Sequence, residues 1–140
     1  MSPEIDQYKS RRELIDNREF QIGEIYLIND GHISIPQADR LKGGRKYHHL
    51  RPVVIIHNNE ENINPLCPTV MIAPLSSRTD LKRPFDLPIF KDTDGVEEDC
   101  LIQLNLSQPV LKVDLSDCLG QISMDKIKEL IALQRIMVNR

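Results

Sequence analysis

Basic and imidazole side chains gather in one polar segment, residues 40–59, which contains no acidic residue. Arginine presents a planar fork of donors that matches phosphate oxygens, and imidazole can accept and donate a proton near neutral pH. The segment therefore predicts a phosphate-binding face with a proton-transfer group, while a solvated surface loop is the alternative explanation of the same charges. The candidate side chains are Arg40, Lys42, Arg45, Lys46, His48, His49 and Arg51.

A second group of this kind follows the apolar residues 69–75. Ser76 and Ser77 offer hydroxyls that can donate hydrogen bonds to a phosphate, although a polar turn after a strand is the simpler explanation. Residues 86–117, by contrast, hold eight acidic and two basic side chains. The total of 18 Lys and Arg against 21 Asp and Glu, net −3, excludes a uniformly basic nucleic-acid binder but not a local phosphate-binding surface.

The composition excludes several other classes of function. There is no tryptophan and aromatic residues make up 4% of the chain, so a platform for stacking single-stranded bases is not expected. Cys67, Cys100 and Cys118 lie far apart without a CxxC pair, which argues against a zinc site and is typical of free thiols. Neither a Gly-x-Ser-x-Gly elbow nor a P-loop is present. We therefore expect no cofactor and no metal.

The beginning of the chain is charged and has no apolar core of a signal peptide. No apolar run approaches the roughly 20 residues that a membrane-spanning helix needs, so we expect a cytoplasmic protein outside the membrane. Residues 1–20 have a loose helical apolar spacing, and Ser2-Pro3 resembles an N-cap with the first helical residue. This pattern predicts an N-terminal helical arm over 1–20, followed by one domain over 21–140.

Short apolar runs separated by turn residues predict a mainly β domain. Pro74 is expected to end the third strand, and Pro88 to place the fourth at an edge of the sheet. Ser123 is expected to cap a final helix that runs to about Val138. Because no helix-length segment lies between the strands, the elements favour a small, strongly curved antiparallel barrel with one C-terminal helix. The expected strands are residues 23–29, 52–57, 69–73, 86–90, 100–106 and 110–113.

Several short motifs occur in a fixed order between residues 21 and 138. They are Gly23-Glu24-Ile25, Arg51-Pro52 with the aliphatic residues 53–56, Pro74-Leu75-Ser76-Ser77, Gln108-Pro109 and Leu119-Gly120, followed by the C-terminal helix. No one of these motifs is specific, but the ordered set resembles the MazF/PemK family of toxin endoribonucleases. The resemblance implies an SH3-like, partly open β-barrel and a homodimer. It also implies sequence-specific, metal-independent cleavage of single-stranded RNA such as mRNA, and a cognate antitoxin protein that blocks the RNA groove.

The resemblance also assigns roles to particular residues. The arginine before the aliphatic strand falls on Arg51 and the hydroxyl after Pro-Leu falls on Ser76, both as catalytic groups. A histidine of the first loop acts in some members, and His32, His48 and His49 all lie in this loop. The resemblance does not choose among them, and we take His48 and His49 as the catalytic candidates. Metal-free RNA cleavage needs a base, an acid and positive charge at the phosphate, which these residue types supply. RNA contacts are expected from Arg45, Lys46, Ser77, Arg78 and Gln108.

The sequence departs from the family pattern at two places. Residues 45–50 separate Gly43-Gly44 from Arg51, so the first loop is longer than in many relatives. Asn105 and Ser107 stand where some relatives place a catalytic Arg and Asp. These departures support a second hypothesis, a catalytically inactive SH3-like barrel that binds nucleic acid or a partner peptide.

Overall fold

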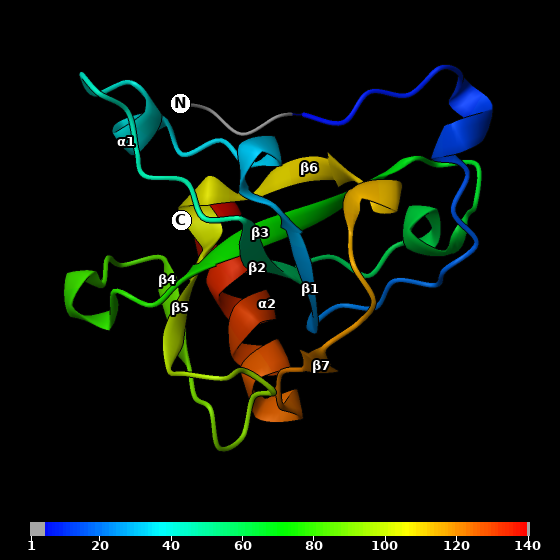
Figure 1. Ribbon diagram of the computed structural model, residues 1–140. Helices are drawn as coiled ribbons and strands as arrows, with labels where there is room; N and C mark the ends of the chain where they lie inside the picture. Colours follow the sequence, from blue (N-terminus) through cyan, green and yellow to red (C-terminus); the bar gives the residue numbers. More distant parts are fainter. Residues whose placement is uncertain (1–4, 140) are drawn as a thin grey trace.

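The computed structural model describes residues 5–139 and consists of a curved antiparallel sheet with one long helix (Figure 1). The strands are β1 (Glu24–Asn29), β2 (Leu50–Ile55), β3 (Thr69–Ser76), β4 (Asp86–Ile89), β5 (Cys100–Gln103), β6 (Gln108–Leu111) and β7 (Gly120–Gln121). The sheet order is β4-β5-β3-β2-β1-β7, with β6 also paired to β3. Every pairing is antiparallel and a long helix follows the strands, which confirms the predicted partly open antiparallel barrel with a C-terminal helix.

The longest strand, β3, pairs with β2, β5 and β6. Residues 69–72 of β3 pair with β6, and residues 75–76 pair with β5. Pro74 lies between these two pairings, inside the strand. The prediction that Pro74 ends the third strand is therefore wrong. The missing backbone donor costs no ladder hydrogen bond on that edge, because neither β6 nor β5 pairs with residue 74. Ser76 is therefore the last residue of a strand and not the first residue of a loop.

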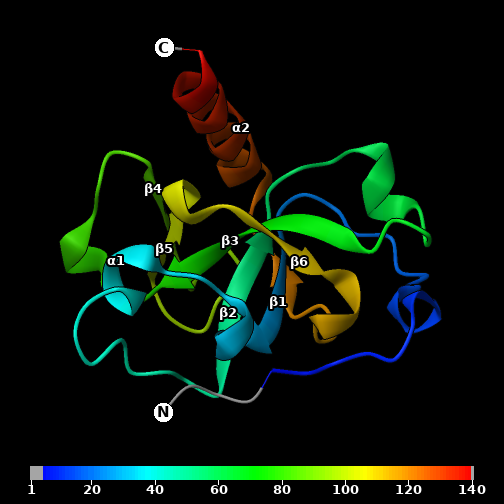
Figure 2. The ribbon, with the colours of Figure 1, turned by 90° about the horizontal axis from the view of Figure 1, so that it is seen from above.

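Two apolar clusters cover the two faces of the sheet, as alternation along the strands requires. Val54 packs on one side with Ile127 and Leu130 of helix α2 (Met124–Val138). Val53 and Ile55 point to the opposite side, where the second cluster lies. Figure 2 shows α2 on one side of the sheet and the N-terminal segment along the other. No helix in the described residues is long and apolar enough to span a membrane.

The C-terminal helix begins and ends where the sequence predicted. The Ser123 side chain accepts a hydrogen bond from the Lys126 amide and caps α2, which runs to Val138. Asp94, on the loop between β4 and β5, accepts a further hydrogen bond from the amide of Ser123 at 3.0 Å. Pro88 lies in β4, which is an edge strand as expected.

The predicted N-terminal helical arm is wrong for the part of it that the structure describes. Only a 3-10 turn, Arg11–Leu14, forms there, and its N-cap Ser10 makes no side-chain hydrogen bond. The predicted cap Ser2-Pro3 lies outside the described residues. The segment follows the barrel surface instead, because Phe20 is fully buried and Arg18 donates to backbone carbonyls of the segment after β6. These tertiary contacts outweigh a weak helical preference.

Three shorter stretches also differ from the prediction. Residues 104–106, expected in the fifth strand, form a 3-10 turn, and β6 begins two residues earlier than expected. The two-residue strand β7 was not predicted. The long polar connection between β1 and β2 contains a 3-10 turn, Asp30–His32, and a short helix α1 (Pro36–Asp39). This connection supplies Asp30, the side chain that pairs with Arg51.

Candidate active site

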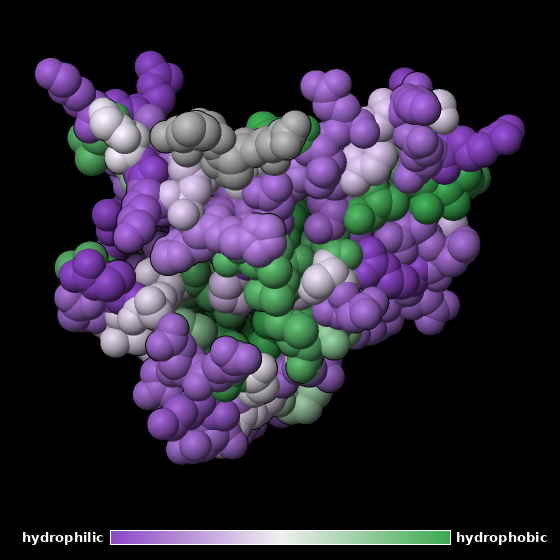
Figure 3. Space-filling view, viewed as in Figure 1, coloured by the Kyte–Doolittle hydropathy of each residue, from purple (hydrophilic) through white to green (hydrophobic). Residues whose placement is uncertain are grey.

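A cleft of about 640 Å³ opens beside the ends of β2 and β3. Its polar lining includes His48, Arg51, Ser76, Ser77 and Arg78, which come from the β1–β2 connection, β2, β3 and the loop after β3. Figure 3 shows a band of hydrophobic surface on this face of the molecule, bordered by hydrophilic side chains. The apolar part of the lining includes Ile25, Leu27, Leu50, Pro52, Leu75 and Leu119. The fold thus brings two groups of predicted site residues, distant in sequence, to one concave surface.

Arg51 is held at the cleft by contacts at two of its nitrogens. Its Nε donates to Oδ1 of Asp30 at 2.6 Å, and its Nη1 donates to the carbonyl of Leu75 at 3.3 Å. The side chain is 13% exposed, and among residues 5–139 its Nη2 has no hydrogen-bond partner. One end of the donor fork is therefore positioned by the protein, and the other remains available for a phosphate oxygen.

Asp30 is completely buried beneath this arginine and was not singled out from the sequence. Its Oδ2 accepts the backbone amide of His48 at 2.9 Å, so one carboxylate orients both Arg51 and the chain at His48. Burial by itself raises the pKa of Asp30. The hydrogen bonds from Arg51 and from the His48 amide, with the charges of Arg51 and Arg45, outweigh that effect and leave the pKa below its usual value. Asp30 is therefore a charged counterpart that fixes the arginine.

Ser76 is half-buried at the end of β3, and its Oγ accepts the amide of Arg78 at 3.2 Å. Because the oxygen is used as an acceptor, the hydroxyl hydrogen can still be donated into the cleft. Ser77 is exposed and lines the same cleft. Arg78 is exposed as well, and its guanidinium pairs with Asp80 at 3.0 Å. The hydroxyls and Arg78 thus remain candidates for phosphate contact.

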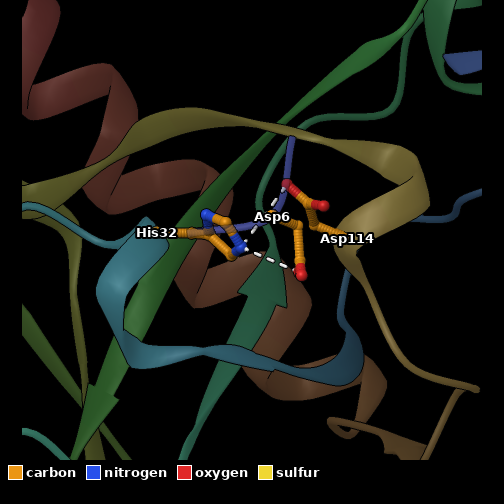
Figure 4. Close-up of side chains that lie close together, drawn as sticks. All are labelled: Asp6, His32 and Asp114. Atoms are coloured by element: carbon orange, nitrogen blue, oxygen red, sulfur yellow. Dashed lines mark hydrogen bonds and ion pairs between the residues drawn. The ribbon is translucent and has the colours of Figure 1, made fainter. Parts of the chain in front are cut away.

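The three candidate histidines lie in different surroundings. His48 and His49 are both exposed, but only His48 lines the cleft with Arg51 and Ser76. His32 lies away from the cleft, where its ring faces Asp6 and Asp114 (Figure 4). The geometry therefore favours His48 over the other two as the proton-transfer group of this cleft.

Three of the predicted RNA contacts are not part of the cleft lining. Arg45 is 6% exposed, and it donates to the carbonyls of Asp30 and Ile33 at 2.7 Å. Gln108 bonds to both backbone groups of Ser34 and so fastens the first loop to β6. Lys46 is exposed beside the loop. The first two side chains therefore organise the loop, and of the three only Lys46 is exposed.

Two acidic side chains in the cleft lining were also missed by sequence reasoning. Glu97 and Glu98, from the loop between β4 and β5, line it and are exposed. Asn105 and Ser107, the two residues at which this sequence departs from the family pattern, do not line the cleft. The Ser107 hydroxyl donates to the carbonyl of Leu104 at 2.6 Å. The only sequence signal for the two glutamates was the excess of acid in residues 86–117.

The comparisons with known proteins support the assignment that the motifs suggested. The profile of the family described as "PemK-like, MazF-like toxin of type II toxin-antitoxin system" matches residues 23–137. A search among curated proteins gave no match. Among solved structures, "Mycobacterium tuberculosis toxin MazF-mt6" is similar with a TM-score of 0.55 and 17% identity, over 64% of this chain and 87% of that one.

A second solved structure, described as an "Mtb toxin", has a TM-score of 0.51 and 19% identity, over 59% of this chain and 87% of that one. At these identities the two structures establish the fold, and the profile match over most of the chain establishes the family. The chain belongs to the PemK-like, MazF-like toxin family of type II toxin-antitoxin systems.

Proposed function

We propose that this chain is an endoribonuclease toxin that cleaves single-stranded RNA, including mRNA, without a metal ion. The observation that carries the proposal is that Arg51, Ser76 and His48 line one cleft on the fold of a toxin family. Arg51 and Ser76 are the family positions identified in the sequence. The cleft lining includes apolar side chains, against which an unpaired base can pack, and polar side chains that can bind the phosphate.

The proposed reaction is an attack of the ribose 2′-hydroxyl on the neighbouring phosphorus. The 2′-oxygen forms a bond to phosphorus, and the bond from phosphorus to the 5′-oxygen breaks, which leaves a 2′,3′-cyclic phosphate and a 5′-hydroxyl. His48 takes the proton from the 2′-hydroxyl and passes it to the departing 5′-oxygen. Arg51 and the Ser76 hydroxyl stabilise the charge on the phosphate oxygens; a positioned donor of this kind contributes about 3–4 kcal/mol.

A long, mixed-sequence single-stranded RNA incubated in excess EDTA tests this proposal. Wild-type protein should give discrete fragments ending in cyclic phosphate, and Arg51→Ala should give none. Arg135→Ala is a matched control, because Arg135 is exposed on α2 and does not line the cleft. A 3′-hydroxyl product, or cleavage that requires a divalent cation, would contradict the mechanism.

The second candidate is a barrel that binds nucleic acid or a peptide without cleaving it. Asn105 and Ser107 favour it, because a neutral amide and a hydroxyl supply neither the cation nor the carboxylate that some relatives have at these positions. This candidate predicts salt-dependent RNA binding by intact wild-type protein with no turnover, weakened but not abolished by Arg51→Ala.

The family also supports two proposals about partners. We propose a cognate antitoxin whose acidic segment occupies the cleft and competes with RNA for Arg51 and Arg78. We also propose a homodimer in solution. Copurification of an acidic partner that blocks cleavage, and the molar mass of the isolated chain measured by light scattering, test the two proposals separately.

A further inference from the structure

Three side chains of types that can ligate a metal ion, from distant parts of the sequence, meet on the face of the sheet away from α2. They are Asp6 of the N-terminal segment, His32 of the turn after β1, and Asp114 of the 3-10 turn Lys112–Asp114 after β6 (Figure 4). Nε2 of His32 lies 3.4 Å from Oδ2 of Asp6 and 4.0 Å from Oδ2 of Asp114. We propose that these residues form a divalent transition-metal site that fastens the N-terminal segment to the barrel.

The spacing of the three ligand atoms is close to that of a coordination shell. They all lie within 4.8 Å of one another. Zinc–nitrogen and zinc–oxygen bonds of about 2.0–2.2 Å place two ligands of a tetrahedral site about 3.4 Å apart. The contact between His32 and Asp6 already has this value. A rotation of the largely exposed Asp6 side chain and a small shift of His32 would complete the shell.

The two ligands on the barrel are already buried and oriented. His32 is 10% exposed and Asp114 is 6% exposed, whereas Asp6 is 67% exposed. The hydroxyl of Tyr8 donates to Oδ1 of Asp114 at 2.5 Å, which leaves Oδ2 directed to His32. Protein metal sites commonly fix a carboxylate ligand in this way, through a hydrogen bond to its other oxygen.

The negative charge of the cluster also favours binding of a cation. Asp6 and Asp114 bring two negative charges to one imidazole. Within residues 5–139, neither carboxylate forms an ion pair with a lysine or an arginine. One imidazole and two carboxylates form a mixed nitrogen and oxygen set that suits Zn²⁺ and Mn²⁺, with water in the remaining positions. The spacings of 26 and 82 residues explain why no sequence motif indicated this site.

A bound ion would link the N-terminal segment to the barrel. Asp6 and Tyr8 both belong to that segment and contact the barrel only at this cluster among the hydrogen bonds and ion pairs of the described residues. His32 is also two residues from Asp30, on the same 3-10 turn that holds Arg51. The metal would therefore also stiffen the turn that supports the candidate active site, without taking part in RNA cleavage.

Titration of the metal-free protein with Zn²⁺ and with Mn²⁺, followed by calorimetry, tests the proposal. Thiolates bind Mn²⁺ poorly, so this ion separates the cluster from the free cysteines. We expect one site per chain, with affinity reduced about tenfold or more in His32→Gln, Asp114→Asn and Asp6→Asn. His57→Gln is the matched control and should bind as wild type does. The Asp6 variant keeps the test valid if the two buried substitutions disturb folding, because Asp6 is largely exposed.

Limited trypsin digestion gives a second measurement that does not depend on binding heat. Cleavage after Lys9, Arg11 and Arg12 should slow when Mn²⁺ is added to wild-type protein, and should not respond to the ion in Asp6→Asn. Absence of a binding site, or equal affinity in wild type and all three variants, would overturn the proposal. Both measurements are made without RNA, so their outcome is independent of the proposed nuclease function.

Discussion

Arg51 donates a 2.6 Å hydrogen bond from Nε to Oδ1 of Asp30, a carboxylate with no exposed surface. The two residues lie 21 positions apart and meet because β1 and β2 pair antiparallel, with Ile28 opposite Arg51. Arg45 also approaches Asp30, at 3.4 Å, so the buried charge is shared between two guanidinium groups. The cleft therefore depends on an ion-pair network beneath its surface.

Replacement of Asp30 by Asn should destabilise the fold as well as the site. Both arginines would lose their buried counter-charge, and breaking a buried pair typically costs about 3–5 kcal/mol. The free energy of unfolding, from urea titration monitored by circular dichroism, measures this loss. Asp80→Asn removes an exposed partner of Arg78 and should leave stability unchanged. Equal stability of Asp30→Asn and wild type would contradict a structural role for this pair.

Acid should destabilise the protein through its buried carboxylates. Burial raises the pKa of Asp94, but hydrogen bonds from the amides of Ser123 and Phe90 outweigh it and lower the pKa overall, as at Asp30. The stabilisation is complete above the unfolded pKa of about 3.9 and is lost as pH falls through the lower folded pKa. Urea unfolding at a series of pH values should show the difference between wild type and Asp94→Asn shrinking below about pH 4. A difference that grows as the pH falls would contradict this assignment.

Removal of the Ser76 hydroxyl should affect turnover rather than folding. Ser76→Ala loses a donor directed to the cleft and should cleave RNA about 100-fold more slowly, by analogy with deletion of a positioned donor at an oxyanion. The only hydrogen bond of the Ser76 hydroxyl within the described chain is the one that it accepts from the Arg78 amide. The melting temperature of Ser76→Ala should therefore change little. Single-turnover cleavage rates of Ser76→Ala and of the wild-type protein test this prediction, since equal rates would exclude a role of the Ser76 hydroxyl in turnover.

Two neighbouring basic residues should respond differently to truncation. Arg45→Ala removes a buried cation from Asp30 and Asp39 and should cost about 3 kcal/mol of stability. Lys46→Ala removes an exposed charge and should leave stability unchanged, while reducing the salt dependence of RNA affinity by about one ion if Lys46 contacts a phosphate. Denaturant unfolding and binding at several salt concentrations measure the two effects. A large loss of stability in Lys46→Ala would reverse these assignments.

Cys100 should be inert to thiol reagents in the folded protein. Burial, with the negative charges of Glu98, Asp99 and Asp94, raises the pKa of its thiol to about 12, so almost no thiolate exists near neutral pH. Cys118 is exposed and should react readily. A chromogenic disulfide applied to native and to urea-unfolded protein measures this, and Cys100→Ser should remove only the thiol that appears on unfolding. Rapid native labelling of Cys100 would contradict its burial.

Local sequence features were sufficient to predict most of the strands and the C-terminal helix. The apolar runs before and after residue 60 predicted β2 and β3, and Ser123 with the helical spacing after it predicted α2. Burial and capping at these positions depend on residues within a few places of each other, so the sequence carries the signal directly. The ordered motifs likewise identified Arg51 and Ser76, which the fold places on one cleft.

The partners of those residues were decided by tertiary structure alone. Asp30 lies in an Asn-Asp-Gly stretch that is typical of a turn, and only strand pairing buries it beneath Arg51. Arg45 belongs to an acid-free segment, yet Asp30 and Asp39 reach it from the preceding loop. Asp6, His32 and Asp114 meet only after the N-terminal segment lies on the barrel. The physical reason is that electrostatic contacts act through a few ångströms of space whatever the separation along the chain, whereas sequence patterns report only neighbouring positions.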